Sequence, residues 1–141
     1  FLEDITKEKG GIPFPNKVSF ISQNWKKYPA LIQDSTLVTK IIDIEKTING
    51  RAYYYIPKEK VLPFAGQIKT GDIILITTKK KGLDTAHVGI AIENEGQIYL
   101  LHASVSDKKV SITTETLPDY LQRITSHSGI MIGRLINFKS N

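Results

Sequence analysis

The hydrophobic pattern is strongest between residues 71 and 104, where it predicts three β-strands. The first, Ile73–Thr77, is a continuous apolar run that follows the turn residues Thr70–Asp72. The second and third, His87–Ile92 and Gln97–Leu101, flank the polar stretch Glu93–Gly96, whose closing glycine is typical of a hairpin loop. The pattern therefore predicts an antiparallel hairpin beside a buried strand.

Two histidines lie on this predicted hairpin. A four-residue loop that places Ile92 opposite Gln97 also places His87 opposite His102, and a two-residue loop at Asn94–Glu95 gives the same register. Directly opposed residues of an antiparallel pair project from the same face, with Cβ atoms roughly 4.5–5.5 Å apart. We therefore expect two imidazoles side by side at one end of the hairpin.

Spacing alone leaves three interpretations of this pair open. The imidazoles can be polar strand-end residues that bond to backbone or water. They can be metal ligands, in which case Asp84 or His127 would have to supply a third ligand. They can be catalytic, with one imidazole as general base and the other fixing its tautomer and orientation. Because the hairpin offers two histidines and no thiolate, we expect no metal and no cofactor.

The chain before this hairpin is expected to be mostly helical. Residues 1–11 are predicted to be the tail of a helix or a loop that runs out at Gly10-Gly11. Apolar residues then recur at helical spacing over residues 16–28, with Asn16 as the N-cap and Pro29 as the stop.

A second helix has the clearer pattern. Its cap is Asp34 or Ser35, Asn49-Gly50 ends it, and its apolar stripe consists of Leu37, Ile41, Ile44 and Ile48. Glu45 lies off this stripe and needs no function.

Further strands complete the predicted sheet, over Arg51–Ile56, Lys109–Ile112 and Gly129–Phe138. Residues 58–60 are expected to be a solvated connection, and a short helix capped by Thr114 or Thr116 precedes the last strand. His127 falls in a polar loop, where we expect it to be exposed. Together these helices and strands predict one α+β domain over residues 1–141, with a mainly antiparallel sheet of about five strands and flanking helices.

Composition narrows the class of protein. The 141 residues carry a net charge of +5, and their lysines are scattered, so a nucleic-acid partner is not favoured. No apolar run is long enough to span a membrane, and the absence of cysteine excludes disulfides and thiolate metal sites. Because the chain begins at Phe1 without an initiator methionine, we expect it to be the C-terminal portion of a longer protein.

Several motifs carry a resemblance to a known family. H-V-G-I-A-I from His87, L-L-H-A-S ending at Ser104 and the strand G-D-I-I resemble the NlpC-type clan of papain-like cell-wall peptidases and amidases. Y-Y-I-P-K, G-L-D-T-A-H, T-L-P-D-Y-L and G-I-M-I-G-R are similar to its N-acetylmuramoyl-L-alanine amidase-like branch. The likeness covers most of the chain from about Tyr54 onward.

The resemblance implies a papain-like core and a chemistry that this chain does not complete. It implies a cysteine nucleophile on a helix, which we expect upstream of residue 1, with His87 as its base and His102 as the orienting residue. Weaker expectations are a substrate contact at Ser104 and steering of a substrate amine by Asp84.

The implied substrate is a peptidoglycan fragment, in the periplasm of a bacterium or otherwise exported. The bond cleaved would be the N-acetylmuramoyl–L-alanine amide or a γ-D-glutamyl bond of the stem peptide. The competing hypothesis is a non-catalytic muropeptide-binding or structural module.

Overall fold

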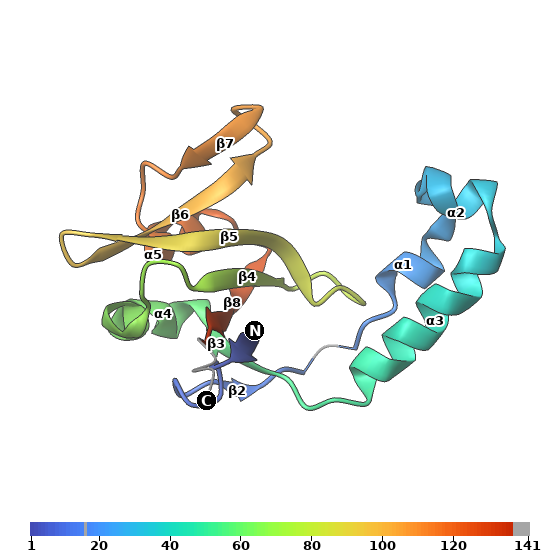
Figure 1. Cartoon of the computed structure of the whole chain (residues 1–141), viewed down its shortest axis with the longest axis horizontal. Helices are drawn as coiled ribbons and strands as arrows, with labels where there is room; N and C mark the ends of the chain where they lie inside the picture. The colour runs from blue at the N-terminus through green and yellow to red at the C-terminus, as the bar shows by residue number, and fades with distance from the viewer. Residues whose placement is uncertain (16, 137–141) are drawn as a thin grey trace, which may run out of the picture.

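A computed structural model describes residues 1–15 and 17–136 of the chain. It has an α+β fold in which one antiparallel sheet carries the body and a set of helices extends to one side (Figure 1). Within the described residues the sheet has eight strands, not about five, in the order β2-β3-β8-β4-β5-β6-β7 with β1 paired to β8. The strands are β1 Leu2–Asp4, β2 Ile12–Pro13, β3 Tyr54–Pro57, β4 Ile73–Thr78, β5 Thr85–Asn94, β6 Gln97–Ser104, β7 Lys109–Ile112 and β8 His127–Leu135.

The extra strands come from short segments that local pattern does not reveal. β1 lies where a helix tail or a loop was expected, and it pairs Leu2 with Leu135. Beyond it, Thr6 is fully buried, and its hydroxyl accepts a hydrogen bond of 2.8 Å from the backbone N–H of Ile132. A three-residue strand shows no periodicity of its own, so pairing with a distant strand alone defines it.

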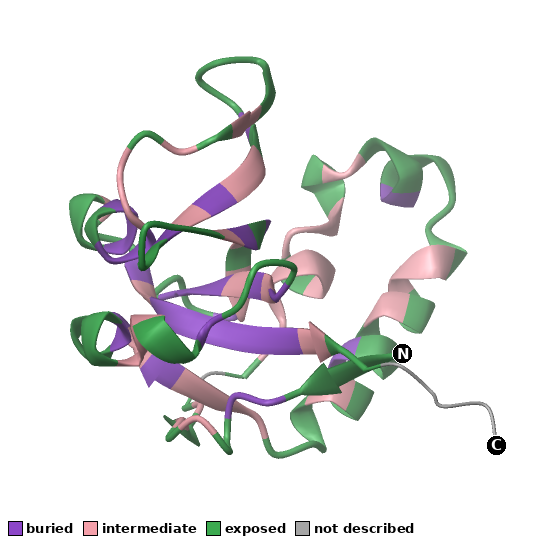
Figure 2. Cartoon of the chain, turned by 60° about the vertical axis from the view of Figure 1, so that its left-hand side comes forward, coloured by how far each residue is buried: buried purple, intermediate pink, exposed green. Residues whose placement is uncertain are grey.

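One face of the sheet, called the inner face below, is covered by α4 (Lys58–Phe64) and α5 (Leu117–Arg123). Figure 2 shows buried stretches along the strands of the sheet. The core side chains of this face are almost fully buried, and they include Ile56, Ile74, Ile76, Ile98, Leu100, Ile130 and Ile132. Residues 58–60, which form the first turn of α4, were expected to be a solvated connection. Instead Lys58 opens that helix and is buried, and Val61 reaches the core.

The helices on the far side of the molecule differ from the single helix expected over residues 16–28. That stretch instead contains α1 (Phe20–Gln23) and a 3-10 turn at Trp25–Lys27, and Pro29 begins α2 (Pro29–Gln33) rather than ending a helix. Proline is well suited to the first turn, where its missing N–H is not needed. The expected cap Asn16 lies outside the described residues.

The longer helix, α3 (Thr36–Asn49), was predicted with correct ends, but one part of its predicted face is wrong. Ile44 is exposed, whereas Glu45 is buried. The Glu45 carboxylate accepts hydrogen bonds from the backbone N–H groups of Ile21 and Ser22, at 3.1 and 3.2 Å. It therefore ties α3 to the first turn of α1, where free N–H groups need an acceptor.

Candidate active site

The site is built on the β5–β6 hairpin, whose two-residue turn lies one residue later than the two-residue turn considered above. Asn94 pairs with Gln97, so the turn residues are Glu95 and Gly96, with φ angles of 51° and 76°. Two such left-handed residues are typical of a type I′ turn, where glycine is favoured. The register is thus shifted by two residues from the predicted one. An even shift keeps every side chain on its predicted face.

The two imidazoles meet despite this shift. His87 Nε2 and His102 Nδ1 are 2.7 Å apart, and the ring planes are nearly perpendicular at 88°. The last pair of the ladder is Ile90–Leu101, and the same register extended by one pair places Gly89, not His87, opposite His102. A Cβ at Gly89 would lie 2.5 Å from the Leu100 side chain, so glycine allows the two strands to approach here. The histidines are therefore diagonal neighbours.

The environment of His87 favours its neutral form. Burial lowers the pKa of His87 below its usual 6.5, and the positive charge that His102 can carry lowers it further. Because Nε2 is occupied by His102, the remaining nitrogen, Nδ1, is the one that can exchange a proton with another group. The pair has the form of a base with an orienting partner.

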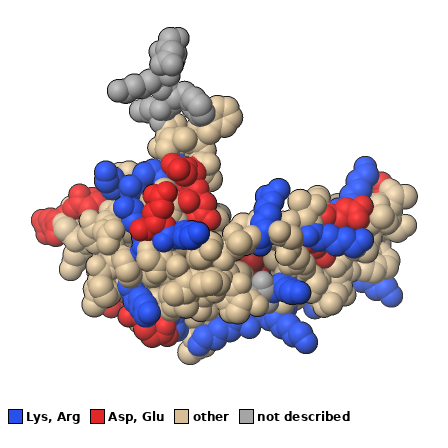
Figure 3. Space-filling model, turned by 90° about the horizontal axis from the view of Figure 1, so that it is seen from below, with Lys and Arg blue, Asp and Glu red and all other residues tan. Residues whose placement is uncertain are grey.

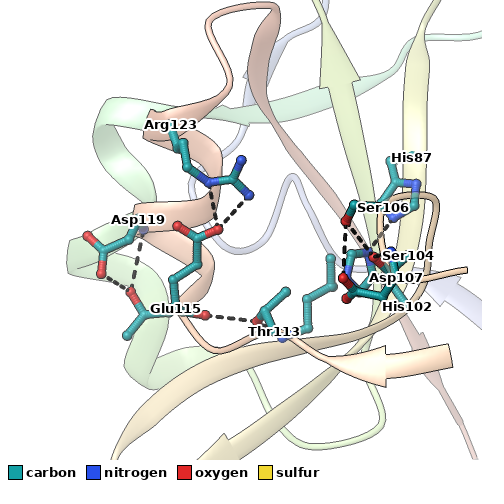
Figure 4. A network of polar contacts seen from close by, with 11 residues as sticks. His87, His102, Ser104, Ser106, Asp107, Thr113, Glu115, Asp119 and Arg123 are labelled. Carbon is teal, nitrogen blue, oxygen red and sulfur yellow. Dashed lines mark hydrogen bonds and ion pairs between the residues drawn. The ribbon is translucent and has the colours of Figure 1, made fainter. Parts of the chain in front are cut away.

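The histidines line a cavity of about 930 Å³ between β6, β7, α5 and the start of β8. The turn after β6 forms one wall: the Ser104 hydroxyl is 3.0 Å from that of Ser106 and accepts a hydrogen bond from the backbone N–H of Asp107 (Figure 4). On the other side Arg123 of α5 forms an ion pair of 2.6 Å with Glu115. The cavity is thus bounded by the imidazoles, hydroxyl groups and charges of both signs.

His127 also lines this cavity, although it was expected to be an exposed loop residue. It is the first residue of β8 and pairs with Thr78 after an irregularity in the ladder. Only 5% of it is exposed, and its Nδ1 has no hydrogen-bond partner within the described part of the chain. Burial is the main cause that lowers the pKa of His127 to about 4. The polar neighbours of His127 in the sequence concealed the start of the strand.

Tyr120 is a further residue of this site that the sequence did not single out. Its ring lies 5.6 Å from that of His102 and 5.7 Å from that of His127, between centroids. Burial raises the pKa of Tyr120 above 10.0, so its hydroxyl stays protonated at neutral pH. Its position in α5 at the middle of T-L-P-D-Y-L was visible, but nothing in the sequence relates that helix to the hairpin.

The two weaker candidates lie in different places. Ser104 is at the cavity, where its hydroxyl serves the turn described above. Asp84 lines a separate cavity with Phe14 and Met131, and its carboxylate accepts a hydrogen bond from the N–H of Thr85. In the part of the chain that the structure describes, no three His, Asp or Glu side chains are grouped so as to hold a metal ion.

Charged side chains of both signs are present on the surface. Figure 3 shows basic and acidic side chains interspersed on the face seen there. Of the helices in the described ranges, none is both long and apolar enough to cross a membrane.

Comparison with known proteins places the chain. An amidase from Bacteroides uniformis, an N-acetylmuramoyl-L-alanine amidase by name, is 35% identical, with a TM-score of 0.88 over 97% of this chain and 58% of its own. A Bacteroides fragilis protein named a "putative xylanase" is 36% identical, with a TM-score of 0.86 over 95% of this chain and 59% of its own. A Legionella pneumophila protein with 20% identity and a TM-score of 0.64 shares the fold, over 96% of this chain and 56% of its own.

This chain therefore spans a little under three fifths of the length of these structures. A search among curated proteins gave no match. The model of the N-acetylmuramoyl-L-alanine amidase-like (AmiA-like) family matches residues 1–130, and the chain belongs to this family.

Proposed function

We propose that this chain forms the histidine-bearing part of a papain-like, NlpC-type amidase that hydrolyses the N-acetylmuramoyl–L-alanine bond of peptidoglycan fragments. The observation that carries the proposal is the 2.7 Å contact between His87 and His102 at the wall of a large cavity. In this role His87 is the general base and acid, and His102 orients it. Family membership supports the substrate class.

The proposed nucleophile is a cysteine from a segment outside residues 1–141. These residues contain no cysteine, and an uncharged imidazole pair has little power to activate water without a metal. The greater length of the related structures is consistent with a further segment. We propose that this segment belongs to the same gene product and that the protein is exported, since its substrate lies outside the cytoplasm.

The proposed reaction has two steps. The thiolate attacks the muramoyl carbonyl carbon, an S–C bond forms, and the C–N bond breaks as the His87 imidazolium gives its proton to the departing amine of L-alanine. Water then attacks the thioester while His87 takes a proton from it, and the thiolate leaves. His102 stabilises the imidazolium and fixes which nitrogen of His87 faces the reaction.

The name of the Bacteroides fragilis protein suggests glycoside hydrolysis instead, which usually needs two carboxyl groups free to act on either side of one bond. The carboxylates at this cavity are already engaged. Glu115 pairs with Arg123, and Asp107 accepts hydrogen bonds from Ser106 and Ser111, at 3.4 Å each. The imidazole pair fits amide hydrolysis better.

The test compares the 141-residue chain with the longer product of the same gene on a purified muropeptide. The longer protein should release a free L-alanine amine, and a thiol-alkylating reagent should abolish the release. A new amine on the residue after D-glutamate would show the γ-D-glutamyl endopeptidase instead. Hydrolysis by the 141-residue chain alone, insensitive to alkylation, would refute the cysteine mechanism.

A further inference from the structure

The position of His102 needs more than its contact with His87. Within the described residues, the imidazole of His102 has one side-chain hydrogen bond, the contact with His87. A ring held at one nitrogen alone can still turn about that bond, and it can flip to present its other nitrogen. Something else must fix its plane.

Tyr120 provides that second contact. Its ring meets the His102 ring edge to face, at 5.6 Å between centroids and 80° between planes. Edge-to-face geometry is directional, because the edge of one ring is positive and the face of the other negative. The contact therefore restricts rotation of the imidazole as well as its position.

The ring of Tyr120 is itself held by two neighbours besides His102. His127 lies against it at 5.7 Å, and the Arg123 guanidinium carbon lies 5.3 Å from its centre. Its helix, α5, is anchored by the buried Leu117 and Leu121, and the cap Thr116 accepts a hydrogen bond from the N–H of Asp119. Only 9% of Tyr120 is exposed. The helix α5 thus holds the Tyr120 ring in a fixed position beside the hairpin.

We propose that Tyr120 is a positioning residue, whose ring, wedged against His127 and Arg123, fixes the plane of His102 so that His102 Nδ1 meets His87 Nε2. Its role in turnover rests on the proposed function, whereas its role in holding the imidazole pair does not. The ring is what matters here, and the phenolic hydroxyl is dispensable.

The test uses the 141-residue chain, which has only three histidines, so their ring signals can be assigned one by one. Nitrogen NMR of the rings reports the tautomer and the titration midpoint of each histidine. In the native chain and in Tyr120→Phe, His87 and His102 should each show one tautomer, with the His87 midpoint below its free value of about 6.5. In Tyr120→Leu, His102 should average between tautomers and the His87 midpoint should rise toward that value.

Tyr120→Met, which also lacks the ring but has a flexible side chain, guards against a folding defect in Tyr120→Leu. Both variants are compared only where thermal unfolding shows a folded protein. Unchanged tautomers and an unchanged His87 midpoint in either folded ring-less variant would overturn the proposal. So would loss of the pair in Tyr120→Phe.

In the longer, active protein, Tyr120→Leu should lower kcat roughly 10-fold with little change in KM, while Tyr120→Phe stays near the native value. A changed NMR spectrum with unchanged turnover would leave the positioning role intact and count against His102 in catalysis. The two readouts thus separate failure of this proposal from failure of the proposed function.

Discussion

The two faces of the sheet are both apolar, yet only one of them is a core. On the inner face Ile74, Ile76 and Leu100 are completely buried beneath α4 and α5. On the outer face, which alternates with it along the same strands, Val88 is 51% exposed and Ile90 42%. Strand alternation therefore indicates which residues share a face, and the helices decide which face becomes buried.

The difference matters for chemistry because the histidines belong to the inner face. His87 pairs with Ile76 on the neighbouring strand, so its ring lies at the edge of the buried inner face of the sheet. Burial there lowers its pKa and keeps it neutral. A histidine at the neighbouring position 88 would face outward and would lack that environment.

The largest stability effect is expected from truncation on the inner face. Ile76→Ala leaves a hole in a fully buried layer and should lower the free energy of unfolding by about 3 kcal/mol. Ile90→Ala, on the outer face, should cost less than about 1 kcal/mol. Urea unfolding of both variants measures the contrast, and equal losses would show that the two faces are equally packed.

A buried ion pair and an exposed ion pair can be compared in the same way. The carboxylate of Asp72, 2% exposed, accepts two hydrogen bonds of 2.7 Å from Arg134, whereas Asp43 pairs with Lys46 at the exposed surface. Asp72→Asn should destabilise the fold by roughly 2 kcal/mol, because it leaves Arg134 without its counter-charge. Asp43→Asn should change stability by less than about 0.5 kcal/mol.

The Asp72 pair also predicts a pH dependence. Burial raises the pKa of Asp72, but the hydrogen bonds from Arg134 and Lys69 and the charge of Arg134 outweigh it, so that the pKa lies below 3.8. The stabilisation is therefore present above about pH 3.8 and is lost as the pH falls through the lowered value. Denaturant titrations at pH 5 and pH 3 should show that the free energy of unfolding falls less between these pH values in Asp72→Asn than in the native chain.

The smallest effect at neutral pH is expected at His127. Its buried Nδ1 has no partner among the described residues, so His127→Phe should be close to neutral at pH 7, where an ordinary buried polar residue would lose stability. The native chain must protonate His127 on unfolding between pH 6.5 and about 4, and its stability should therefore fall as the pH is lowered across that range.

The phenylalanine variant should show a shallower fall in Tm between pH 7 and pH 4.5. An equally steep fall would assign the acid sensitivity to other groups, and a large loss of stability at pH 7 would mean that His127 has a partner.

Much of this arrangement could be predicted from the sequence, because it depends on local pattern. The strands of the hairpin and the common face of His87 and His102 follow from period-two alternation. The register was wrong by two residues because several polar residues before Gly96 are able to form the turn, and the glycine selected Glu95-Gly96. His87 and His102 still lie on the predicted common face, but they are not directly opposite each other.

What could not be predicted depends on contacts between distant segments. β1 exists only because it pairs with β8, and the burial of Glu45 depends on the N–H groups of α1. Tyr120 and His127 reach the site because α5 packs against β6 and β8, and β8 pairs with β4, the strand beside the hairpin. No local signal distinguishes them from an ordinary helix aromatic and a loop histidine.

The most direct test of the account is one pair of substitutions at adjacent positions on opposite faces of β5, made in the longer gene product that we propose to hydrolyse the muropeptide. His87→Ala should lower kcat/KM by about 10³-fold while the protein remains folded, because the proposed thiol nucleophile would lose its general base. Val88→Ala, on the exposed outer face, should leave kcat/KM within about twofold of native. Full activity in a folded His87→Ala protein would contradict the assignment of this hairpin as the catalytic centre.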